Sequence, residues 1–352
     1  MSRISRIVST IDSHTAGEPT RLVVGGLPQI PGRTMAEKLA HARREMDGLR
    51  GLLMLEPRGR QDMYGALLTA PCDPAADFGL IFMNTQQYTT MCGHAIIGAA
   101  TTVVETGLVP GGGPPETSGE LSVVFDTPVG LAPTQSKVVD GQVLGVSFQN
   151  TPVFVHKQGA CLSLPDLGPL SVDIVYSGGF FALIDAQDLG LDLVPRNAEA
   201  LAQLGVDLRC AANSQLQVRH PEQHHVTTID GVEFHEPVRR QPDGSLRARN
   251  VASFGDRTID RSPCGTGTCA RMAVLHARGD LAVGQRFISE SIIGTRFVGQ
   301  IVEETRVGGA QAIIPQVTGR AHLTGFHQFV LDPDDPFPGG FSLSDRAPAG
   351  GT

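Results

Sequence analysis

Short apolar runs, most of them containing β-branched or aromatic residues, dominate the pattern of hydrophobic and polar positions. Gly, Pro, Asn and Asp separate these runs, which is typical of strands in twisted or barrel-like sheets. The runs that predict strands are residues 3–12, 21–27, 51–57, 65–70, 78–83, 121–127, 143–149, 153–156, 172–178 and 180–185. We therefore expect a protein rich in curved β-sheet.

Four stretches predict helices instead. Residues 35–49 and 197–204 repeat apolar positions every three or four residues with polar residues between, which indicates amphipathic helices with a face in solvent. The runs after Cys92-Gly93 and after Cys264-Gly265 are apolar on nearly every side, which is typical of buried helices. Gly107 and Gly279 end these two runs as expected C-caps. Two sheet-wrapped helices predict two domains of related design.

The two buried helices share a beginning. Cys92-Gly93 and Cys264-Gly265 lie 172 residues apart, and a Gly follows each cysteine by 15 residues. Two similar cysteines at two similar turns are suited to aim two thiols at one carbon from opposite sides. That arrangement would let one group remove a proton while the other returns a proton to the opposite face.

Composition limits the remaining choices. With 352 residues, of which 41% are hydrophobic, the chain can bury two medium-sized cores. Six cysteines without a CxxC pair favour free thiols over a disulfide scaffold. The first residues lack the apolar core of a signal peptide or membrane span, so we expect a cytoplasmic protein that does not bind membranes.

Charge and aromatic content point to a small partner. The net charge of −8 and the absence of a Lys/Arg-rich cluster argue against nucleic-acid binding. The chain has no Trp and three Tyr, so a platform for base stacking is not expected either. We expect a small-molecule substrate.

A cysteine at the first turn of a helix has special chemistry. It lies at the positive end of the helix dipole, beside N–H groups that have no intrahelical partner. Such positions favour the thiolate, and the same N–H groups can bind a carboxylate. Gly93 and Gly265 let the backbone approach a ligand closely. A small α-amino acid could thus be held by its carboxylate, with its Cα between two sulfur atoms.

Two nearby polar residues are candidates for binding the amine. Asp260, four residues before Cys264, could pair with an ammonium nitrogen, and His94 could contact the carboxylate or the amine. Each has a plainer alternative: His94 as a helix-start residue satisfied by backbone, and Asp260 as a turn-capping carboxylate. A single cysteine is also more often an inert packing residue than a base.

Two other classes of function compete. A thiol–disulfide enzyme would also use two cysteines, but usually as CxxC or an exposed pair. A metal site is conceivable from His220, His224, His225 and His235, but their spacing is irregular and a solvated loop is the preferred interpretation. We expect no metal and no cofactor.

Several segments closely resemble the proline racemase family, which includes hydroxyproline 2-epimerases and trans-3-hydroxyproline dehydratases. The resemblance lies in residues 12–20, 91–94, 260–268 and 290–295, and extends through residues 56–59, 62–65, 178–182 and 324–332. It therefore covers nearly the whole chain. An inactive binding homologue is disfavoured because Cys92, His94, Asp260 and Cys264 occur together.

The resemblance implies an α/β fold of the diaminopimelate-epimerase type. Two pseudo-symmetric domains, each a curved mixed sheet around a central buried helix, would flank the active site. We expect residues 1–150 and 325–345 to form a first lobe carrying Cys92, and residues 151–324 a second lobe carrying Cys264. Residues 338–352 are expected to be a frayed tail, and residues 110–119 a turn-rich surface loop. A homodimer is compatible with this family.

The resemblance also implies a cofactor-independent two-base mechanism. Cys92 and Cys264 would be the bases, and His94 and Asp260 would hold the substrate nitrogen. The backbone amides that would hold the carboxylate are those of Gly93, His94, Gly265 and Thr266.

The family resemblance also bears on the type of reaction. The dehydratases typically have Thr at the second cysteine position, so Cys264 favours inversion of Cα in proline or a hydroxyproline. The alternative is dehydration of trans-3-hydroxy-L-proline. Tyr64 stands where proline racemases usually have Phe, and Tyr is commoner among the dehydratases, as is the Ala that follows His94. A phenol at the pocket wall could bond a ring hydroxyl group, which favours a hydroxylated substrate, while Phe254 matches the other aromatic wall of the racemase pocket.

Overall fold

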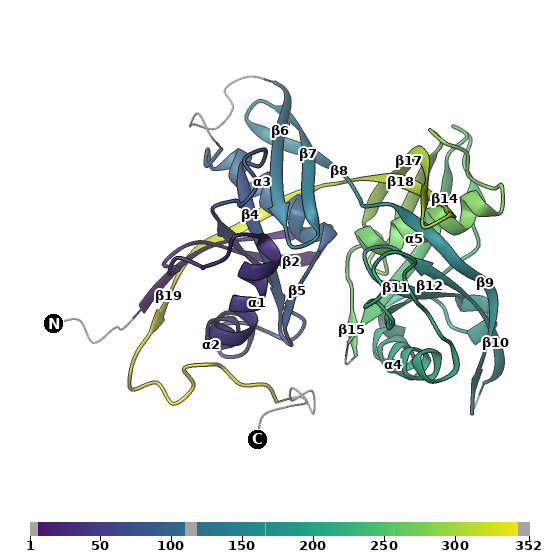
Figure 1. Cartoon of the computed structure of the whole chain (residues 1–352), viewed down its shortest axis with the longest axis horizontal. Coiled ribbons are helices and arrows are strands. Elements are labelled where there is room, and N and C mark those ends of the chain that lie inside the picture. The colour runs from purple at the N-terminus through teal and green to yellow at the C-terminus, as the bar shows by residue number, and fades with distance from the viewer. Residues whose placement is uncertain (1–5, 110–117, 166, 256, 344–352) are drawn as a thin grey trace. The chain divides into compact units, whose positions relative to one another are not determined.

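The computed structural model describes residues 6–109, 118–165, 167–255 and 257–343. It contains two compact units (Figure 1). The first comprises Met1–Phe148 and Arg320–Thr352, and the second comprises Gln149–Gly319. The expected surface loop at residues 110–119 lies almost entirely outside the described residues, as does the tail beyond residue 343.

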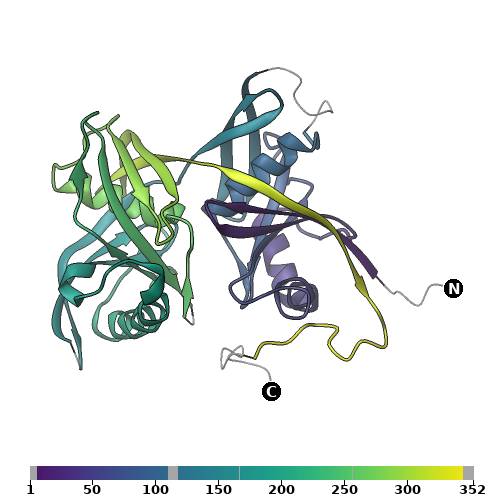
Figure 2. The same cartoon turned by 180° about the vertical axis from the view of Figure 1, so that it is seen from behind.

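The first unit is built on one mixed sheet with the strand order β19, β1, β2, β3, β4, β6, β7, β8. Neighbouring strands are antiparallel except for the parallel pairs β2–β3 and β4–β6. The strands are β1 (Arg6–Thr15), β2 (Glu18–Gly25), β3 (Tyr64–Thr69), β4 (Phe78–Asn84), β5 (Tyr88–Thr89), β6 (Gly119–Thr127), β7 (Gly130–Val139), β8 (Gln142–Gln149) and β19 (Ala321–Leu331), and the helices are α1 (Met35–Glu45), α2 (Asp47–Met54) and α3 (Gly93–Glu105). Figure 2 shows the last strand, β19, lying along the first, β1.

The second unit has the order β9, β10, β11, β12, β14, β16, β17, β18, and β18 pairs again with β9 to close the sheet. The parallel pairs are β11–β12 and β14–β16. The strands are β9 (Val153–Leu164), β10 (Gly168–Tyr176), β11 (Phe180–Asp185), β12 (Ile229–His235), β13 (Arg239–Arg240), β14 (Leu246–Phe254), β15 (Thr258–Ile259), β16 (Arg286–Glu290), β17 (Arg296–Val307) and β18 (Ala310–Gly319). The helical elements are the 3₁₀ turns η1 (Ala186–Leu189) and η2 (Pro195–Asn197) and the α-helices α4 (Ala198–Gln215) and α5 (Gly265–Ala277).

The two units share one design. In each eight-strand order, the third and fifth pairs are the parallel ones. The connection across the first parallel pair carries α1 and α2 in one unit and α4 in the other, and the connection across the second carries α3 or α5. This agreement confirms the expected α/β fold with two units, each a curved mixed sheet around a central helix.

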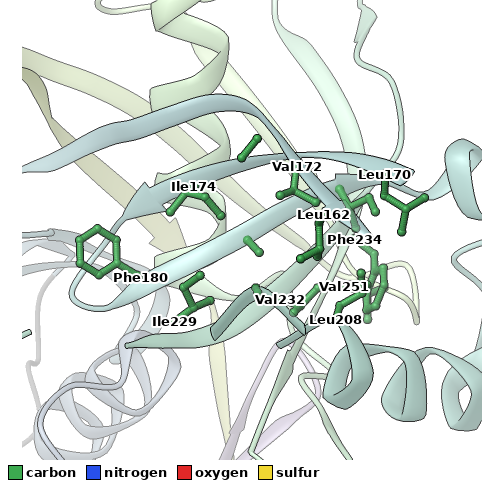
Figure 3. Close-up of a cluster of buried hydrophobic side chains, with 14 of the residues drawn as sticks. Leu162, Leu170, Val172, Ile174, Phe180, Leu208, Ile229, Val232, Phe234 and Val251 are labelled. Carbon is green, nitrogen blue, oxygen red and sulfur yellow. The ribbon is translucent and has the colours of Figure 1, made fainter. Parts of the chain in front are cut away.

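The central helices are buried because their sequences are apolar on all sides. Every residue of α3 from Gly93 to Val104 is buried, and α5 is buried over most of its length. The outer helices instead bury one face. In the second unit, Leu208 of α4 packs with Phe234 and Val251 of the sheet (Figure 3). The sequence pattern predicted this contrast between central and outer helices.

Both central helices end in the same way. Gly107 and Gly279 adopt left-handed φ values of 68° and 79°. In each case the glycine N–H donates to the carbonyl three residues back, and the following N–H donates to the carbonyl five residues before it. This is the Schellman arrangement, which a residue with a Cβ adopts at a cost. The predicted C-caps are confirmed.

Other predictions of local structure were wrong. Residues 51–57 were expected to form a strand, but Asp47–Met54 is helix α2. A short continuous apolar run does not distinguish a buried strand from a buried helix, and here the preceding amphipathic segment continues into it after a break at Met46. The helix expected at residues 197–204 is longer, because α4 continues to Gln215.

The beginning of the tail is paired in the structure. Glu56 and Phe341 exchange two backbone hydrogen bonds, of 3.1 and 2.8 Å. The rings of Phe337 and Phe341 lie 4.8 Å apart between centroids. The chain therefore has ordered contacts as far as Phe341. No helix in the described part of the chain has the length and apolar character that crossing a membrane needs.

Candidate active site

The predicted site residues of the first unit gather around the start of α3. We call Cys92, Gly93, His94 and Tyr64 the Cys92 cluster. Cys92 is the N-cap residue, with an extended backbone (φ −155°), and its side chain is buried. Its Sγ turns to the His94 ring, 3.3 Å from Nδ1 and 3.6 Å from Nε2. The thiol and the imidazole therefore touch at the first turn of the helix.

His94 is fixed from two sides. Its backbone carbonyl accepts a 2.8 Å hydrogen bond from Thr15 Oγ1 on β1, and its ring meets Tyr64 edge to face at 4.9 Å between centroids. Burial lowers the pKa of His94 to about 3, although a backbone hydrogen bond to Pro19 opposes this change. At neutral pH the ring is therefore uncharged, and it can serve as a hydrogen-bonding group beside Cys92 rather than as a cation.

Tyr64 begins strand β3 and forms one wall of this cluster. Its phenol oxygen accepts a hydrogen bond from Asn84 Nδ2 at 3.4 Å, from the paired position on β4. The side chain is partly exposed. The phenol is thus held against His94 at the edge of the cluster.

The second unit gathers its predicted residues around the start of α5. We call Cys264, Asp260, Gly265, Thr266 and Phe254 the Cys264 cluster. Cys264 is again the N-cap residue, but its φ is 58°, in the left-handed region. Its Sγ accepts a 3.3 Å hydrogen bond from the Gly267 N–H and lies 3.4 Å from Thr266 Oγ1. The sulfur therefore caps its own helix, as an Ncap side chain does.

Asp260 is positioned by the turn before the helix. Its Oδ1 accepts the Ser262 N–H at 2.8 Å, and Ser262 Oγ in turn accepts the Cys264 N–H at 3.1 Å. Burial raises the pKa of Asp260 to about 6, while hydrogen bonds from Ser262 and Cys264 hold it down. Asp260 therefore does cap a turn, the plainer alternative from the sequence, and it also lies beside the thiol.

The thiol of Cys264 differs from expectation. A helix start was expected to favour the thiolate, but burial raises the pKa of Cys264 well above its usual value. The carboxyl groups of Asp260 and Glu233 raise this pKa further, while the Thr266 and Gly267 hydrogen bonds oppose them. Desolvation and two nearby acids outweigh the helix N-terminus here.

Phe254 and Thr266 are held by neighbouring strands. Phe254 ends β14, and its ring meets Phe181 of β11 edge to face at 5.5 Å. The backbone carbonyl of Thr266 accepts a 2.8 Å hydrogen bond from Ser177 Oγ, at the turn after β10. These contacts fix an aromatic wall and the first turn of α5.

The first turns of α3 and α5 provide equivalent backbone donors. Helix geometry leaves the first N–H groups of each helix without an intrahelical acceptor, and the dipole favours negative charge there. Gly93 and His94 supply such groups in α3, and Gly265 and Thr266 supply them in α5. Both helix starts are suited to a carboxylate.

Sequence reasoning missed several supporting residues. Thr15 and Ser177 each hold a site residue through one hydrogen bond, and Ser262 holds two, Asp260 and Cys264. Asn250 Nδ2 donates to the Pro263 carbonyl at 2.7 Å, which fixes the residue before Cys264. Ser262 had a signal in the sequence, because it lies between Asp260 and Cys264. The other three are distant in sequence, and only the fold brings them to the helix starts.

The remaining cysteines and the histidine-rich stretch take other roles. All six cysteines are free, and Cys269 is fully buried in α5, where burial raises its pKa to about 12. In the described residues, no three His, Cys, Asp or Glu side chains gather as metal ligands. His220 Nδ1 instead accepts backbone N–H groups of Glu222 and Gln223.

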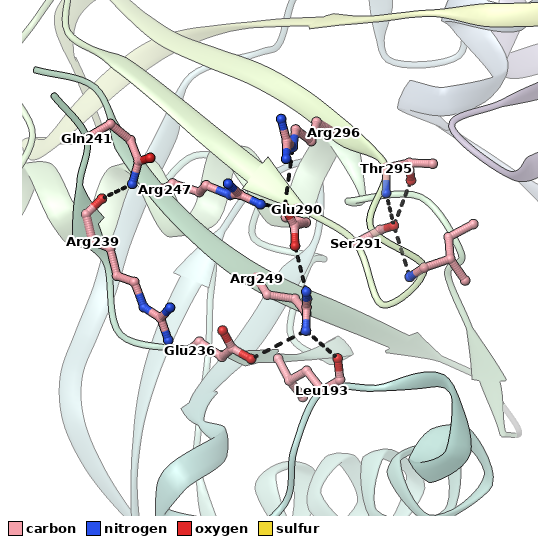
Figure 4. A network of polar contacts seen from close by, with 11 residues as sticks. Leu193, Glu236, Arg239, Gln241, Arg247, Arg249, Glu290, Ser291, Thr295 and Arg296 are labelled. Carbon is pink, nitrogen blue, oxygen red and sulfur yellow. Dashed lines mark hydrogen bonds and ion pairs between the residues drawn. The ribbon is translucent and has the colours of Figure 1, made fainter. Parts of the chain in front are cut away.

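The family-like segment at residues 290–295 forms a charged network (Figure 4). Glu290 contacts Arg247, Arg249 and Arg296, and Ser291 bonds with Thr295. Burial acts to raise the pKa of Glu290, but the Arg249 and Arg247 contacts outweigh it and lower the pKa. This segment therefore holds β14, β16 and β17 together.

Comparisons with known proteins agree over the whole chain. The proline racemase family matches residues 10–342. A proline racemase of Clostridioides difficile is 47% identical over 342 residues, 97% of this chain and 99% of the relative. A trans-3-hydroxy-L-proline dehydratase of Bacillus thuringiensis is 39% identical, with 97% and 99% covered. A hydroxyproline epimerase from Agrobacterium vitis, solved with bound trans-4-hydroxy-L-proline, is 35% identical with a TM-score of 0.86, covering 97% of each chain.

Proposed function

The chain belongs to the proline racemase family and is an amino-acid isomerase, and we propose that it inverts Cα of proline or a hydroxyproline with Cys92 and Cys264 as its two bases. One observation carries the proposal. Each of two units of the same design places a cysteine at the N-cap of its central buried helix. A two-base inversion requires two such groups, one for each face of Cα.

The proposed reaction needs one thiolate and one thiol. The thiolate removes the α-proton from one face of the substrate, and the electron pair left behind is delocalised into the carboxylate. The thiol then gives its proton to the opposite face, which restores the C–H bond with inverted configuration. Each turnover exchanges the protonation states of Cys92 and Cys264, so the enantiomer is processed by the reverse sequence. No cofactor is needed for the proton balance.

The carboxylate must be stabilised because the α-proton of an amino acid is a very weak acid. We propose that it binds the backbone N–H groups of Gly93, His94, Gly265 and Thr266. Each well-placed donor in a comparable oxyanion site contributes about 2.7 to 4 kcal/mol. Binding of one substrate by both helix starts would also exclude water from the reacting carbon.

The amine would be bound by the two polar residues beside the cysteines. Asp260 is largely ionised at neutral pH because its pKa is about 6, so it can pair with the substrate's ammonium group. His94 is uncharged there, since its pKa is about 3, and it can accept a hydrogen bond without repelling that group. A cationic imidazole would oppose binding of the cationic amine.

Tyr64 bears on the identity of the substrate. Its hydroxyl group is anchored to Asn84 and its ring to His94, so a phenol stands next to the proposed amine site. We propose that it hydrogen-bonds a ring hydroxyl group, and that a hydroxylated proline is the preferred substrate. Phe254, packed on Phe181, would cover the apolar part of the ring.

Dehydration of trans-3-hydroxy-L-proline is the alternative activity. After loss of the α-proton, this reaction expels the C3 hydroxyl group and needs no acid on the opposite face. A thiol at position 264 would then serve no purpose in the chemistry. The presence of Cys264 at a helix N-cap therefore favours inversion.

A substrate panel tests the proposal. The protein is incubated separately with L-proline, trans-4-hydroxy-L-proline and trans-3-hydroxy-L-proline, and products are followed by chiral chromatography and a ketoacid assay. We expect inversion at Cα, fastest with a hydroxyproline. Ketoacid formed from the 3-hydroxy compound, without inversion of any substrate, would replace this proposal by the dehydratase.

Two further expectations stay predictions. A homodimer and a cytoplasmic location were inferred from the family resemblance and the first residues of the sequence. Light scattering on the purified protein would give a mass near twice 37.3 kDa if the dimer forms.

A further inference from the structure

One buried acid in the second unit has no role in the proposed mechanism. Glu233 lies on β12 between β11 and β14, and it is 0% exposed. Neither of its carboxyl oxygens has a hydrogen-bond partner among the residues that the structure describes. Leaving a carboxyl group buried in this way is costly, and such groups cluster at functional sites. Glu233 therefore needs an explanation beyond packing.

The side chain of Glu233 points at the first turn of α5. A Cβ added at Gly267 would collide with Glu233 Oε2, so the carboxyl group fills the space beside this glycine and would have to move to admit a side chain. The same hypothetical Cβ would lie 3.3 Å from the Cβ of Cys264. The N–H of Gly267 also donates to Cys264 Sγ. The Glu233 carboxyl group and the Cys264 thiol thus approach the same glycine.

Few charges face Glu233. Arg271, one turn further along α5, is 4% exposed, and its Nε and Nη1 have no partner in the described part of the chain. Asp260 precedes the helix, Cys264 and Cys269 lie on it, and His235 follows on β12. Burial raises the pKa of Glu233 to about 8, Arg271 lowers it and Asp260 raises it. Burial and the Arg271 charge lower the pKa of His235, so this ring is neutral and does not offset the acids.

We propose that Glu233 is a positioning residue whose own protonation decides whether Cys264 keeps its proton in the resting enzyme. The proposal rests on the proposed function, in which Cys264 is one of the bases. With Glu233 protonated, the Gly267 N–H stabilises a Cys264 thiolate against the charge of Asp260 alone. With Glu233 ionised, a Cys264 thiolate would be a third negative charge beside two ionised acids, so the proton stays on Cys264.

This arrangement would decide which of the two cysteines, Cys92 or Cys264, carries the proton. The reaction requires one cysteine protonated and the other ionised. An ionised Glu233 favours the form with its proton on Cys264, and a protonated Glu233 makes the reverse form accessible. In the first unit, the Cys92 thiol instead touches the neutral ring of His94.

The test follows the titration of each cysteine in the whole protein without substrate. Selective ¹³Cβ labelling of cysteine gives one NMR signal per cysteine, assigned with single Cys→Ser variants, and these signals report ionisation of buried thiols. Glu233→Gln keeps the shape of the protonated acid but cannot ionise. We expect it to lower the titration midpoint of Cys264 by about one pH unit and to leave that of Cys92 unchanged.

Control variants separate this effect from general loosening. Glu290→Gln makes the same exchange at another buried acid, which pairs with three arginines and not with Cys264. This variant should not move the titration midpoint of Cys264. If the Glu233→Gln protein does not fold, Glu233→Met, which has no polar group, replaces it. Glu233→Met should lower the titration midpoint of Cys264 by a similar amount. A Cys264 titration identical in wild type and Glu233 variants overturns the proposal. So does an equal shift of Cys264 in Glu290→Gln.

A kinetic measurement gives a second readout. If Cys264 is the less acidic thiol, its ionisation sets the basic limb of the pH profile of kcat/KM. Glu233→Gln should then move this limb to lower pH, by the same amount as it moves the Cys264 midpoint in the NMR titration. The NMR result stands whether or not the protein inverts proline, because no substrate is present. Failure of the Glu233 proposal and failure of the proposed function are therefore distinguishable.

Discussion

The Cys92 and Cys264 clusters occupy equivalent places in two units of the same design, yet their proton chemistry differs. Both cysteines precede a buried helix that begins with glycine and ends in the same Schellman arrangement. Cys92 has an extended backbone and touches a neutral imidazole. Cys264 has a left-handed backbone and lies beside two acids. The repeated fold sets the position of the thiol and the helix N–H groups, and the local residues set where protons are held.

The backbone difference has a direct consequence for the sulfur atoms. The positive φ of Cys264 directs its Sγ toward the Gly267 N–H, so this thiol caps its helix. Cys92 Sγ turns instead toward a side chain two residues away. A non-glycine residue with φ near 58° is uncommon and requires support, which Ser262 and Asn250 give by fixing the turn before it.

The largest expected effect comes from removing either sulfur. Cys92→Ser and Cys264→Ser should each lower the rate of inversion by at least about 10²- to 10⁴-fold, because a hydroxyl group is a far weaker base than a thiolate. Polarimetry of proline and trans-4-hydroxyproline measures the rate. Cys161→Ser, at an exposed cysteine, should keep full activity. Substantial inversion by either cluster variant would show that the two cysteines are not both bases.

Loss of the amine contact should have the next largest effect. Asp260→Asn should lower kcat/KM by roughly 10- to 150-fold, the equivalent of about 1.5–3 kcal/mol for a hydrogen bond to a charged group. The wild-type profile should fall below pH about 6, where the Asp260 carboxylate is protonated, and this acid limb should be missing in the variant. An unchanged acid limb in Asp260→Asn would assign it to another group.

Glu233, beside the Cys264 cluster, and His94 of the Cys92 cluster should respond to pH in opposite directions. The pKa of Glu233 is raised from 4.5 to about 8 on folding, so its contribution to stability is present below pH 4.5 and lost as pH rises through about 8. The pKa of His94 is lowered from 6.5 to about 3, so its contribution is present above pH 6.5 and lost as pH falls toward 3. The contribution of Glu233 to the free energy of unfolding is therefore lost in base, and that of His94 is lost in acid.

Urea unfolding at several pH values checks this opposition. Glu233→Gln should flatten the decline in unfolding free energy between about pH 5 and pH 8, and His94→Gln should flatten the decline below about pH 6. Each variant should leave the other branch of the curve unchanged. A Glu233→Gln protein whose stability falls with rising pH as steeply as wild type would contradict the inferred protonation of Glu233.

The smallest effect is expected at Tyr64. Tyr64→Phe removes one neutral hydrogen bond, so turnover of hydroxyproline should fall by roughly 2- to 13-fold, the equivalent of about 0.5–1.5 kcal/mol. Turnover of proline should hardly change. Parallel kcat/KM measurements on the two substrates give the comparison, and equal losses would remove the role proposed for the phenol.

Much of the fold could be predicted from the sequence. The two helices that are apolar on all sides and end in glycine gave the two-unit design, because such helices are buried and the runs around them predict strands. The run at residues 51–57 was assigned wrongly, since consecutive apolar residues have no period that separates a strand from a buried helix. The end of helix α4 was predicted too early. Its last turns are more polar than its first, so the apolar repeat that predicts a helix is weaker there.

The candidate site was only partly visible in the sequence. Cys92 stands in a short motif with His94, and Asp260 in another with Cys264, so the proximity within each pair followed from spacing. The position of Glu233 did not, because an acid in an alternating strand usually faces solvent, and only the fold places it against Gly267. The raised pKa of Cys264 was missed for the same reason, since the desolvation and the second acid depend on tertiary packing.

The central claim is that two different cysteines act on the two faces of Cα, and isotope transfer tests it most directly. Each enantiomer is incubated separately in D₂O, and deuterium at Cα is measured in product and recovered substrate at low conversion. Two bases predict deuterium in the product and hydrogen in the recovered substrate, from either direction. Product that keeps the hydrogen of its substrate would show that one group both removes and returns the proton, which would contradict the account.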